Sequence, residues 1–158
     1  YKKAYDVIKL KNTTPYQKSL DYYDALYAIY KDKDVPAYLE RMKRYLASLG
    51  EDANGADYAS AAQSLYYAAA SKLRPEDHRQ AIAWLEKAIP GETVLMNKIN
   101  YLVMVGDSYK ELKDYASARK YYNQAYAESL QLASMEQAQQ VVQASVTYKL
   151  ATLELLEK

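Results

Sequence analysis

The sequence of 158 residues contains no cysteine. Disulfide bridges, thiolate metal ligands and cysteine nucleophiles are therefore excluded. Only 4 Gly and 4 Pro are present, so helix breakers are few and little of the chain can form turn-rich β structure. No apolar run approaches the roughly 18 residues that a membrane-spanning helix needs, so we expect no membrane span.

Neither sign of charge dominates, because 21 Lys and Arg residues stand against 20 Asp and Glu residues. A protein that binds nucleic acid usually carries a basic excess or a basic stripe, so we expect no nucleic-acid partner. Half of the residues are hydrophobic (50%), which favours a folded core over disorder. The first residue is Tyr1 rather than Met, so we expect a trimmed piece of a longer protein. This start and the missing cysteine favour an extracytoplasmic location, although absence of cysteine fits either redox environment.

Phenylalanine is also absent, whereas tyrosine occurs 19 times. Tyrosine can pack much as phenylalanine does while its hydroxyl reaches solvent. One explanation is a compositional bias of the source, and another is a tyrosine-lined ligand groove. Both explanations can hold for different tyrosines.

Apolar residues recur at helical spacing along the chain, and no segment alternates with the period of a strand. We therefore predict an all-α protein of about 7 or 8 helices. The connections are short, so consecutive helices should pack antiparallel. The predicted helices cover about 16–30, 35–49, 56–73, 75–89, 93–112, 115–130 and 134–156, with a further helix or helix end at 1–11.

Local signals support these boundaries. Gly50 should end the second helix, and Thr93, Asp114 and Ser134 should cap the helices that follow them. In the first helix, spacings of four and three predict one apolar face. That face contains Tyr16, Leu20, Tyr23, Tyr27 and Tyr30, and Tyr22, Leu26 and Ile29 widen it.

A pattern of large and small residues occurs twice in the second half of the chain. The clearer copy reads Leu102-x2-Val105-Gly106-x2-Tyr109, followed by Ala118-x3-Tyr122-x2-Ala125. Small residues at Gly106 and Ala118 would let two helices cross at close range. Another copy lies 37 residues upstream (69 against 106) and contains Leu65, Ala69, Ala81, Leu85 and Ala88. The first-helix pattern returns in Val141, Ala144, Ser145 and Tyr148, either as a terminal cap or as the start of a further unit.

This pattern resembles the tetratricopeptide repeat, in which helix pairs stack because no unit can bury its apolar face alone. The resemblance is strongest over about 99–130 and weaker toward both ends. It implies a right-handed superhelical stack of antiparallel helix pairs in a single domain, 1–158. The units would span 15–50, 56–90 and 93–132, with a terminal helix at 134–157. The structural repeat positions would be Leu65, Ala69, Ala81, Leu85, Ala88, Leu102, Gly106, Tyr109, Ala118, Tyr122 and Ala125.

The resemblance also implies where a partner would bind, since the first helix of each unit usually lines a concave face. On this sequence that face would contain Tyr22, Leu26, Tyr66, Ala70, Val103, Asp107 and Lys110. A different interpretation places the two tyrosines and Val103 in the core and treats Asp107 and Lys110 as solvated charges. The Lys, Arg and Asn clamp with which some family members hold a C-terminal carboxylate is missing. A groove of Tyr and small residues would suit a peptide held by apolar anchors.

No constellation of residues indicates catalysis. His78 is the only histidine, and its sequence neighbour Asp77 would lie on a different helix face. We therefore interpret His78 as a surface residue. Acidic pairs lie at turns and helix starts, where they favour the helix dipole, and the few glycines form no phosphate loop. We predict no enzyme activity, no metal site and no cofactor.

Taken with the resemblance, these absences predict a non-catalytic interaction or scaffold module that binds a protein or peptide on its concave face. Two alternatives stay open. The chain could be a helical appendage of a larger protein, for example one with a thioredoxin-like or other extracytoplasmic enzyme domain. It could also bind a small molecule in a tyrosine-lined groove. The residues name neither the partner nor the oligomeric state.

Overall fold

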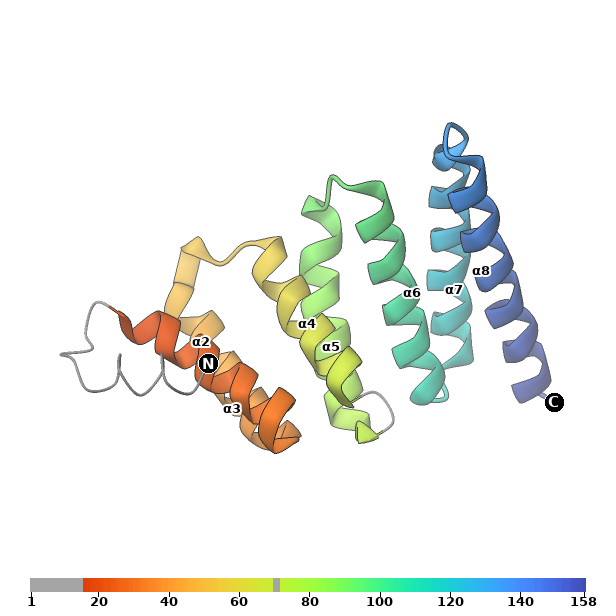
Figure 1. The fold of residues 1–158 in the computed structure, drawn as a ribbon. Coiled ribbons are helices and arrows are strands. Elements are labelled where there is room, and N and C mark those ends of the chain that lie inside the picture. The colour runs from red at the N-terminus through yellow and green to blue at the C-terminus, as the bar shows by residue number, and fades with distance from the viewer. Residues whose placement is uncertain (1–15, 70–71) are drawn as a thin grey trace. The chain divides into compact units, whose positions relative to one another are not determined.

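The computed structural model describes residues 16–69 and 72–158, and every regular element in them is helical (Figure 1). The predicted all-α fold class is therefore confirmed. These residues form seven α-helices, α2 to α8, joined by short π-helical, 3-10 and turn segments. The helix predicted at 1–11 lies outside the described residues. No helix within them combines the length and the hydropathy of a membrane span.

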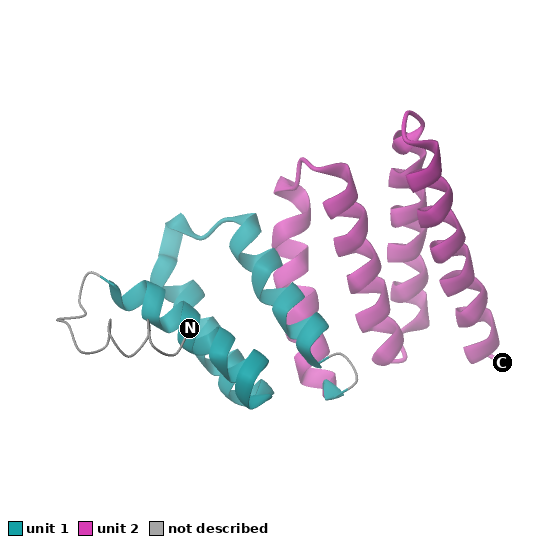
Figure 2. Ribbon diagram, viewed as in Figure 1, with its two compact units in different colours: residues 1–73 teal, residues 74–158 magenta. Residues whose placement is uncertain are grey.

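The chain divides into two compact units, residues 1–73 and residues 74–158 (Figure 2). Unit 1 contains α2, α3 and α4, and unit 2 contains α5 to α8. The single domain and the superhelical stack stay predictions.

Unit 1 has helix ends that follow local sequence signals. Its elements are α2 (Gln17–Tyr27), a π-helical segment (Ala28–Asp32), α3 (Val35–Leu49), a 3-10 turn (Gly50–Asp52) and α4 (Gly55–Ala69). Asp34 caps α3, because its carboxylate accepts a hydrogen bond of 2.9 Å from the Ala37 amide. Gly50 ends α3 with a φ of +57°, a left-handed conformation that glycine adopts without strain. The predicted end of this helix is therefore confirmed.

The buried face of α2 agrees with the predicted one at Leu20 and Ile29 and differs from it elsewhere. Tyr16, Tyr23 and Tyr30 are exposed. The buried residues of α2 and its π-helical extension are Leu20, Ala25, Ala28 and Ile29. Small and aliphatic side chains can be buried without leaving a polar atom unpaired, whereas a buried tyrosine hydroxyl needs a partner. Tyr38 of α3 has one, because its hydroxyl donates to the Ala61 carbonyl at 2.7 Å.

Unit 2 is built from four α-helices in sequence. They are α5 (Pro75–Ala88), α6 (Leu95–Glu111), α7 (Tyr115–Ser129) and α8 (Glu136–Leu156), with 3-10 turns at Ile89–Gly91 and Leu130–Leu132. Asp114 caps α7 as predicted and accepts from the Ser117 amide at 3.0 Å. The predicted caps Thr93 and Ser134 are wrong, since the residues in the N-cap positions are Val94 and Met135. Before α6, the Glu92 carboxylate accepts from the Val94 amide at 2.8 Å instead.

The α6–α7 hairpin has a close contact at Gly106. A Cβ atom added to Gly106 would lie 2.6 Å from Tyr122 Cδ1, closer than two carbon atoms can approach. Any residue larger than glycine at position 106 would therefore force the Tyr122 ring to move. The turn between the helices contains Lys113, whose φ of 61° is the left-handed conformation that glycine more often adopts.

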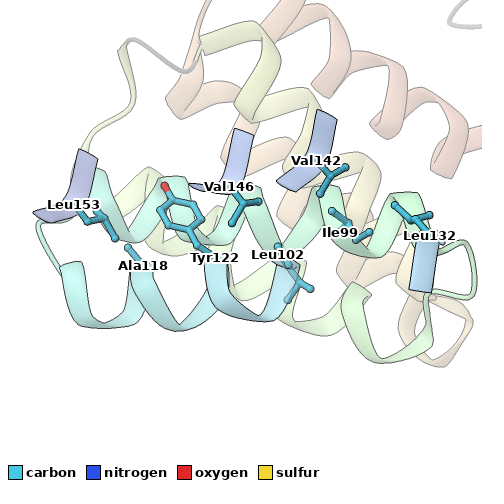
Figure 3. Packing of buried hydrophobic residues seen from close by; sticks show 9 residues of the cluster. Ile99, Leu102, Ala118, Tyr122, Leu132, Val142, Val146 and Leu153 are labelled. Atoms are coloured by element: carbon cyan, nitrogen blue, oxygen red, sulfur yellow. The ribbon is translucent and has the colours of Figure 1, made fainter. Parts of the chain in front are cut away.

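The core of unit 2 joins α6, α7 and α8 (Figure 3). It contains Ile99, Leu102, Ala118, Tyr122, Ala125, Leu132, Val142, Val146 and Leu153. Of the eleven residues assigned to repeat positions, ten are buried in the structure and Tyr109 is half-buried. The repeat positions therefore contribute buried side chains to the cores of both units.

Candidate interaction surfaces

Two of the predicted binding residues, Tyr22 and Leu26, lie half-buried on α2. The Tyr22 ring packs against Tyr45 with 5.1 Å between ring centroids and edge-on against Tyr23 at 5.5 Å. Burial raises the pKa of Tyr22 despite an opposing hydrogen bond with Ser60. Tyr22 is thus part of an aromatic cluster in unit 1 and only partly available to a partner.

Two more residues of the predicted surface are Tyr66, which lies on α4, and Ala70. Tyr66 is half-buried and contacts Tyr67 edge-on, with 5.6 Å between ring centroids. Tyr67 itself is exposed. Ala70 lies outside the described residues.

The three predicted residues on α6 do not form one open surface. Val103 is half-buried and packs against the core of unit 2. Lys110 is half-buried and pairs with Glu111 at 3.2 Å. Asp107 is 9% exposed, so its interpretation as a solvated charge is wrong.

Asp107 is held inside unit 2 by two partners. Its Oδ1 accepts a hydrogen bond of 2.6 Å from the Tyr122 hydroxyl. The same oxygen accepts one of 2.7 Å from Nζ of Lys149, a residue of α8. A buried carboxylate is stable when it is paired and hydrogen-bonded in this way. The sequence could not reveal this, because Lys149 is 42 residues away.

A groove that the sequence did not predict lies on unit 2, with a volume of about 390 Å³. We call it the α5 groove. It is lined by Arg79, Ile82, Ala83, Glu86, Tyr109, Leu112 and Asp114. The four α5 residues are spaced by three, one and three positions, which places them along one helix face. This spacing is a signal in the sequence, whereas the repeat pattern predicts only a packing role for Tyr109.

Hydrogen bonding and ring stacking hold one wall of the α5 groove. The Tyr121 hydroxyl donates to Glu86 Oε1 at 2.6 Å, and the Tyr121 ring stacks on Tyr109 with 5.6 Å between centroids. Burial and the bond to Glu86 raise the pKa of Tyr121. Burial, followed by the charges of Glu86 and Asp114, raises the pKa of Tyr109. Both hydroxyls therefore keep their protons at neutral pH.

His78 is not a surface residue, contrary to our interpretation. It is 6% exposed, and its Nδ1 has no hydrogen-bond partner among the described residues. Burial lowers its pKa, against the opposing charges of Glu111 and Asp77. Helical spacing and flanking charges marked this position as exposed, but the folded chain buries it.

Asp77, the neighbour of His78, lies in the first turn of α5. Its carboxylate accepts three hydrogen bonds from Arg74, of 2.9 Å from the amide and 3.1 and 3.0 Å from the guanidinium. Burial would raise the pKa of Asp77, but these bonds outweigh it and lower the pKa. Asp77 therefore acts as a helix cap.

Within residues 16–69 and 72–158, no group of three or more His, Cys, Asp and Glu side chains could hold a metal ion. Comparison with protein-family models, with curated proteins and with solved structures finds no significant match.

Proposed function

We propose that this chain is a non-catalytic protein-interaction module and that the α5 groove binds a peptide segment of its partner. The observation that carries this proposal is the combination of an apolar floor and a charged rim in one concave surface. Its volume of about 390 Å³ is at the lower end of the range found for ligand pockets. One or two side chains of a partner would fill it.

The floor suits an apolar anchor. Ile82 is buried, Leu112 and Tyr109 are half-buried, and Ala83 is exposed. An anchor that displaces water from such a floor contributes most of the binding free energy in small interfaces. We expect an aliphatic or aromatic residue at this point of the partner.

The rim suits a basic residue next to that anchor. Two of its three charged side chains, Glu86 and Asp114, are acidic, and the third is Arg79. The hydrogen bond from Tyr121 holds Glu86 in one place, so less conformational freedom is lost when a partner binds. A Lys or Arg of the partner would pair with the acidic side of the rim.

The acidic groups of the groove have structural tasks, which supports a binding role over a catalytic one. Glu86 accepts from Tyr121, and Asp114 caps α7 through Ser117. A general base needs a pKa near neutrality and a free path to its substrate. His78 is buried and does not line the groove.

We further propose that α6 and α7 form a tetratricopeptide-like unit within a superhelical stack of such pairs. The contact between Gly106 and the Tyr122 ring supports it, since the repeat pattern requires a small residue where its two helices cross. In this proposal the partner contacts the end of the first helix, at Tyr109 and Leu112. It contacts neither Val103 nor Asp107, which are engaged in packing.

Selection from a displayed library of random peptides tests the proposed groove. Peptides selected on the unchanged protein should share an apolar residue beside a basic one, and calorimetric titration gives their affinities. Ala83→Arg fills the groove and should weaken these peptides at least tenfold, roughly 1.4 kcal/mol. Ala127→Arg is the matched control, because Ala127 is an exposed alanine of α7 that does not line the groove. Equal affinity for the Ala83→Arg variant would rule out this site.

A further inference from the structure

Helix α8 exposes large apolar side chains along one side. Val141, Tyr148 and Leu155 are 65%, 75% and 70% exposed. They are seven positions apart, which is close to two helical turns, so they lie in one row. The side of α8 that carries Val142, Val146 and Leu153 is buried in the core of unit 2.

The exposed side of α8 lacks the charges that a solvent-facing helix surface normally carries. Between Glu136 and Glu154, the only charged side chain is Lys149, and it pairs with Asp107 at 2.7 Å. Neighbouring exposed positions hold Gln140 and Thr147. An uncharged row of large apolar side chains over about four turns indicates a surface that a partner covers.

Small residues separate the large ones in a symmetric order. We call this row the α8 stripe, and it contains Val141, Ala144, Ser145, Tyr148, Ala151, Thr152 and Leu155. On each side of the central Tyr148 lie two small residues and then a large aliphatic one, Val141 on one side and Leu155 on the other. The order reads the same in both directions from Tyr148.

This symmetric order favours a second copy of the same helix as the partner that covers the α8 stripe. When two α8 helices pack antiparallel about a two-fold axis at Tyr148, Val141 of one lies opposite Leu155 of the other. By the same count, Ser145 lies opposite Ala151. A two-fold interface must be self-complementary in this sense, because each copy presents the same surface. The small residues would let the two helix backbones approach closely.

Opposed helix dipoles favour the antiparallel direction over the parallel one. The charged residues at the two ends of α8 are Glu136 at its start and Glu154, Glu157 and Lys158 at its end, and Glu157 pairs with Arg119 at 2.6 Å within the chain.

We propose that the α8 stripe is a self-association surface through which two copies of this chain form a two-fold symmetric dimer. One pair of helices buries on the order of 500 Å² from each copy, which is at the weak, reversible end of specific interfaces. The dimer should therefore dissociate on dilution. This surface is separate from the α5 groove, so the proposal does not depend on peptide binding.

Sedimentation equilibrium over about 1 to 200 μM tests the dimer, a range that suits a weak interface. The average mass should rise toward twice that of the chain. Tyr148→Glu places two like charges on the axis and should weaken association at least tenfold. Thr147→Glu is the matched control, because Thr147 is exposed but lies about 100° around the helix from Tyr148. A chain that stays monomeric throughout, or equal weakening by both variants, would overturn the proposal.

Cysteine cross-linking tests the register, and the absence of native cysteine makes each introduced thiol unique. Tyr148→Cys should oxidise rapidly to a disulfide-linked dimer, since its two copies meet at the axis. Val141→Cys should not, because its two copies lie about 21 Å apart along the axis, 14 positions at 1.5 Å each. Rapid cross-linking of both variants would indicate a parallel or random encounter and would refute the two-fold arrangement. Failure of Tyr148→Cys to cross-link faster than Val141→Cys would refute it as well.

Discussion

Helices α6 and α8 carry large and small residues at the same spacing, but these residues are buried on α6 and exposed on α8. Leu102, Val105 and Gly106 of α6 are buried. Their counterparts 39 residues later (141 against 102) are Val141, Ala144 and Ser145, and all three are exposed. On α6 this side is covered by α7, and the Tyr122 ring lies against Gly106. On α8 no described residue covers it.

The different burial of α6 and α8 shows which features of the structure a repeat pattern specifies and which it does not. The spacing places large and small residues along one side of a helix, where a second helix could pack closely. It does not supply that second helix. The same residue types therefore stabilise the fold on α6 and remain available for association on α8.

The largest expected difference between the two helices comes from removing a large side chain. Leu102→Ala should lower the free energy of unfolding by about 2–5 kcal/mol, because Leu102 is buried in the core of unit 2 and leaves a cavity. Val141→Ala should change it by less than about 0.5 kcal/mol, since Val141 is exposed. Urea unfolding followed by fluorescence checks both, because Trp84 is the only tryptophan and is buried in unit 2. Equal losses would contradict the different burial of the two helices.

Adding a methyl group at the small positions is the next test. Gly106→Ala should lower the free energy of unfolding by about 1–3 kcal/mol, because its Cβ would overlap the Tyr122 ring. Alanine is the better helix former, so a stabilisation of about 1 kcal/mol would appear if the ring could move away freely. Ser145→Ala on α8 should remain within about 0.5 kcal/mol of the unchanged protein. The same urea titration distinguishes these outcomes.

Removing the hydroxyl of Tyr122 on α7 and that of Tyr148 on α8 should give a smaller difference in the free energy of unfolding. Tyr122→Phe removes the 2.6 Å hydrogen bond to Asp107 and should destabilise the protein by about 1–2 kcal/mol. The loss is moderate because Lys149 still pairs with the same carboxylate. Tyr148→Phe should leave stability unchanged, since the Tyr148 side chain is exposed. A destabilisation by Tyr148→Phe as large as that by Tyr122→Phe would show that α8 is covered within the chain.

The smallest expected effect is a pH dependence that separates stability from self-association. The pKa of His78 in the folded protein is lowered below its ordinary value of 6.5, first of all by burial. The unfolded chain then binds the proton more readily, so stability is complete above about pH 6.5 and declines as the pH falls below it. His78→Gln should reduce this decline in urea titrations at about pH 7.5 and 5.5.

Self-association through the α8 stripe should not change over the same pH range, because the stripe has no group that titrates there. A dimer that dissociates between these two pH values without loss of folding would contradict the stripe as its surface.

Much of the fold could be predicted because helix formation depends on neighbouring residues. The bounds of α3 agree with the predicted 35–49, and those of α5 and α7 differ from the prediction by one residue at one end. Asp34 and Asp114 cap their helices through side chains three residues from the amide they bind. Where two acceptors compete, the prediction was wrong, as for Thr93 and Glu92 before α6.

The candidate site could be predicted only in part. The helical spacing of Arg79, Ile82 and Glu86, three and then four positions, is visible in the sequence. The groove also needs Tyr109 and Asp114, which come later in the chain, at the end of α6 and the start of α7. The charged residue Asp107 was assigned to a binding surface, and its ion pair with Lys149 on α8 was not foreseeable.

The order of the residues therefore determined the helices, most of their ends and the small residue Gly106, which allows α6 and α7 to approach closely. These features depend on contacts within a few residues along the chain. Only the tertiary structure decided that His78 and Asp107 are buried and that the α8 stripe is not. Burial depends on which distant helix lies opposite a side chain, and spacing along one helix does not contain that information.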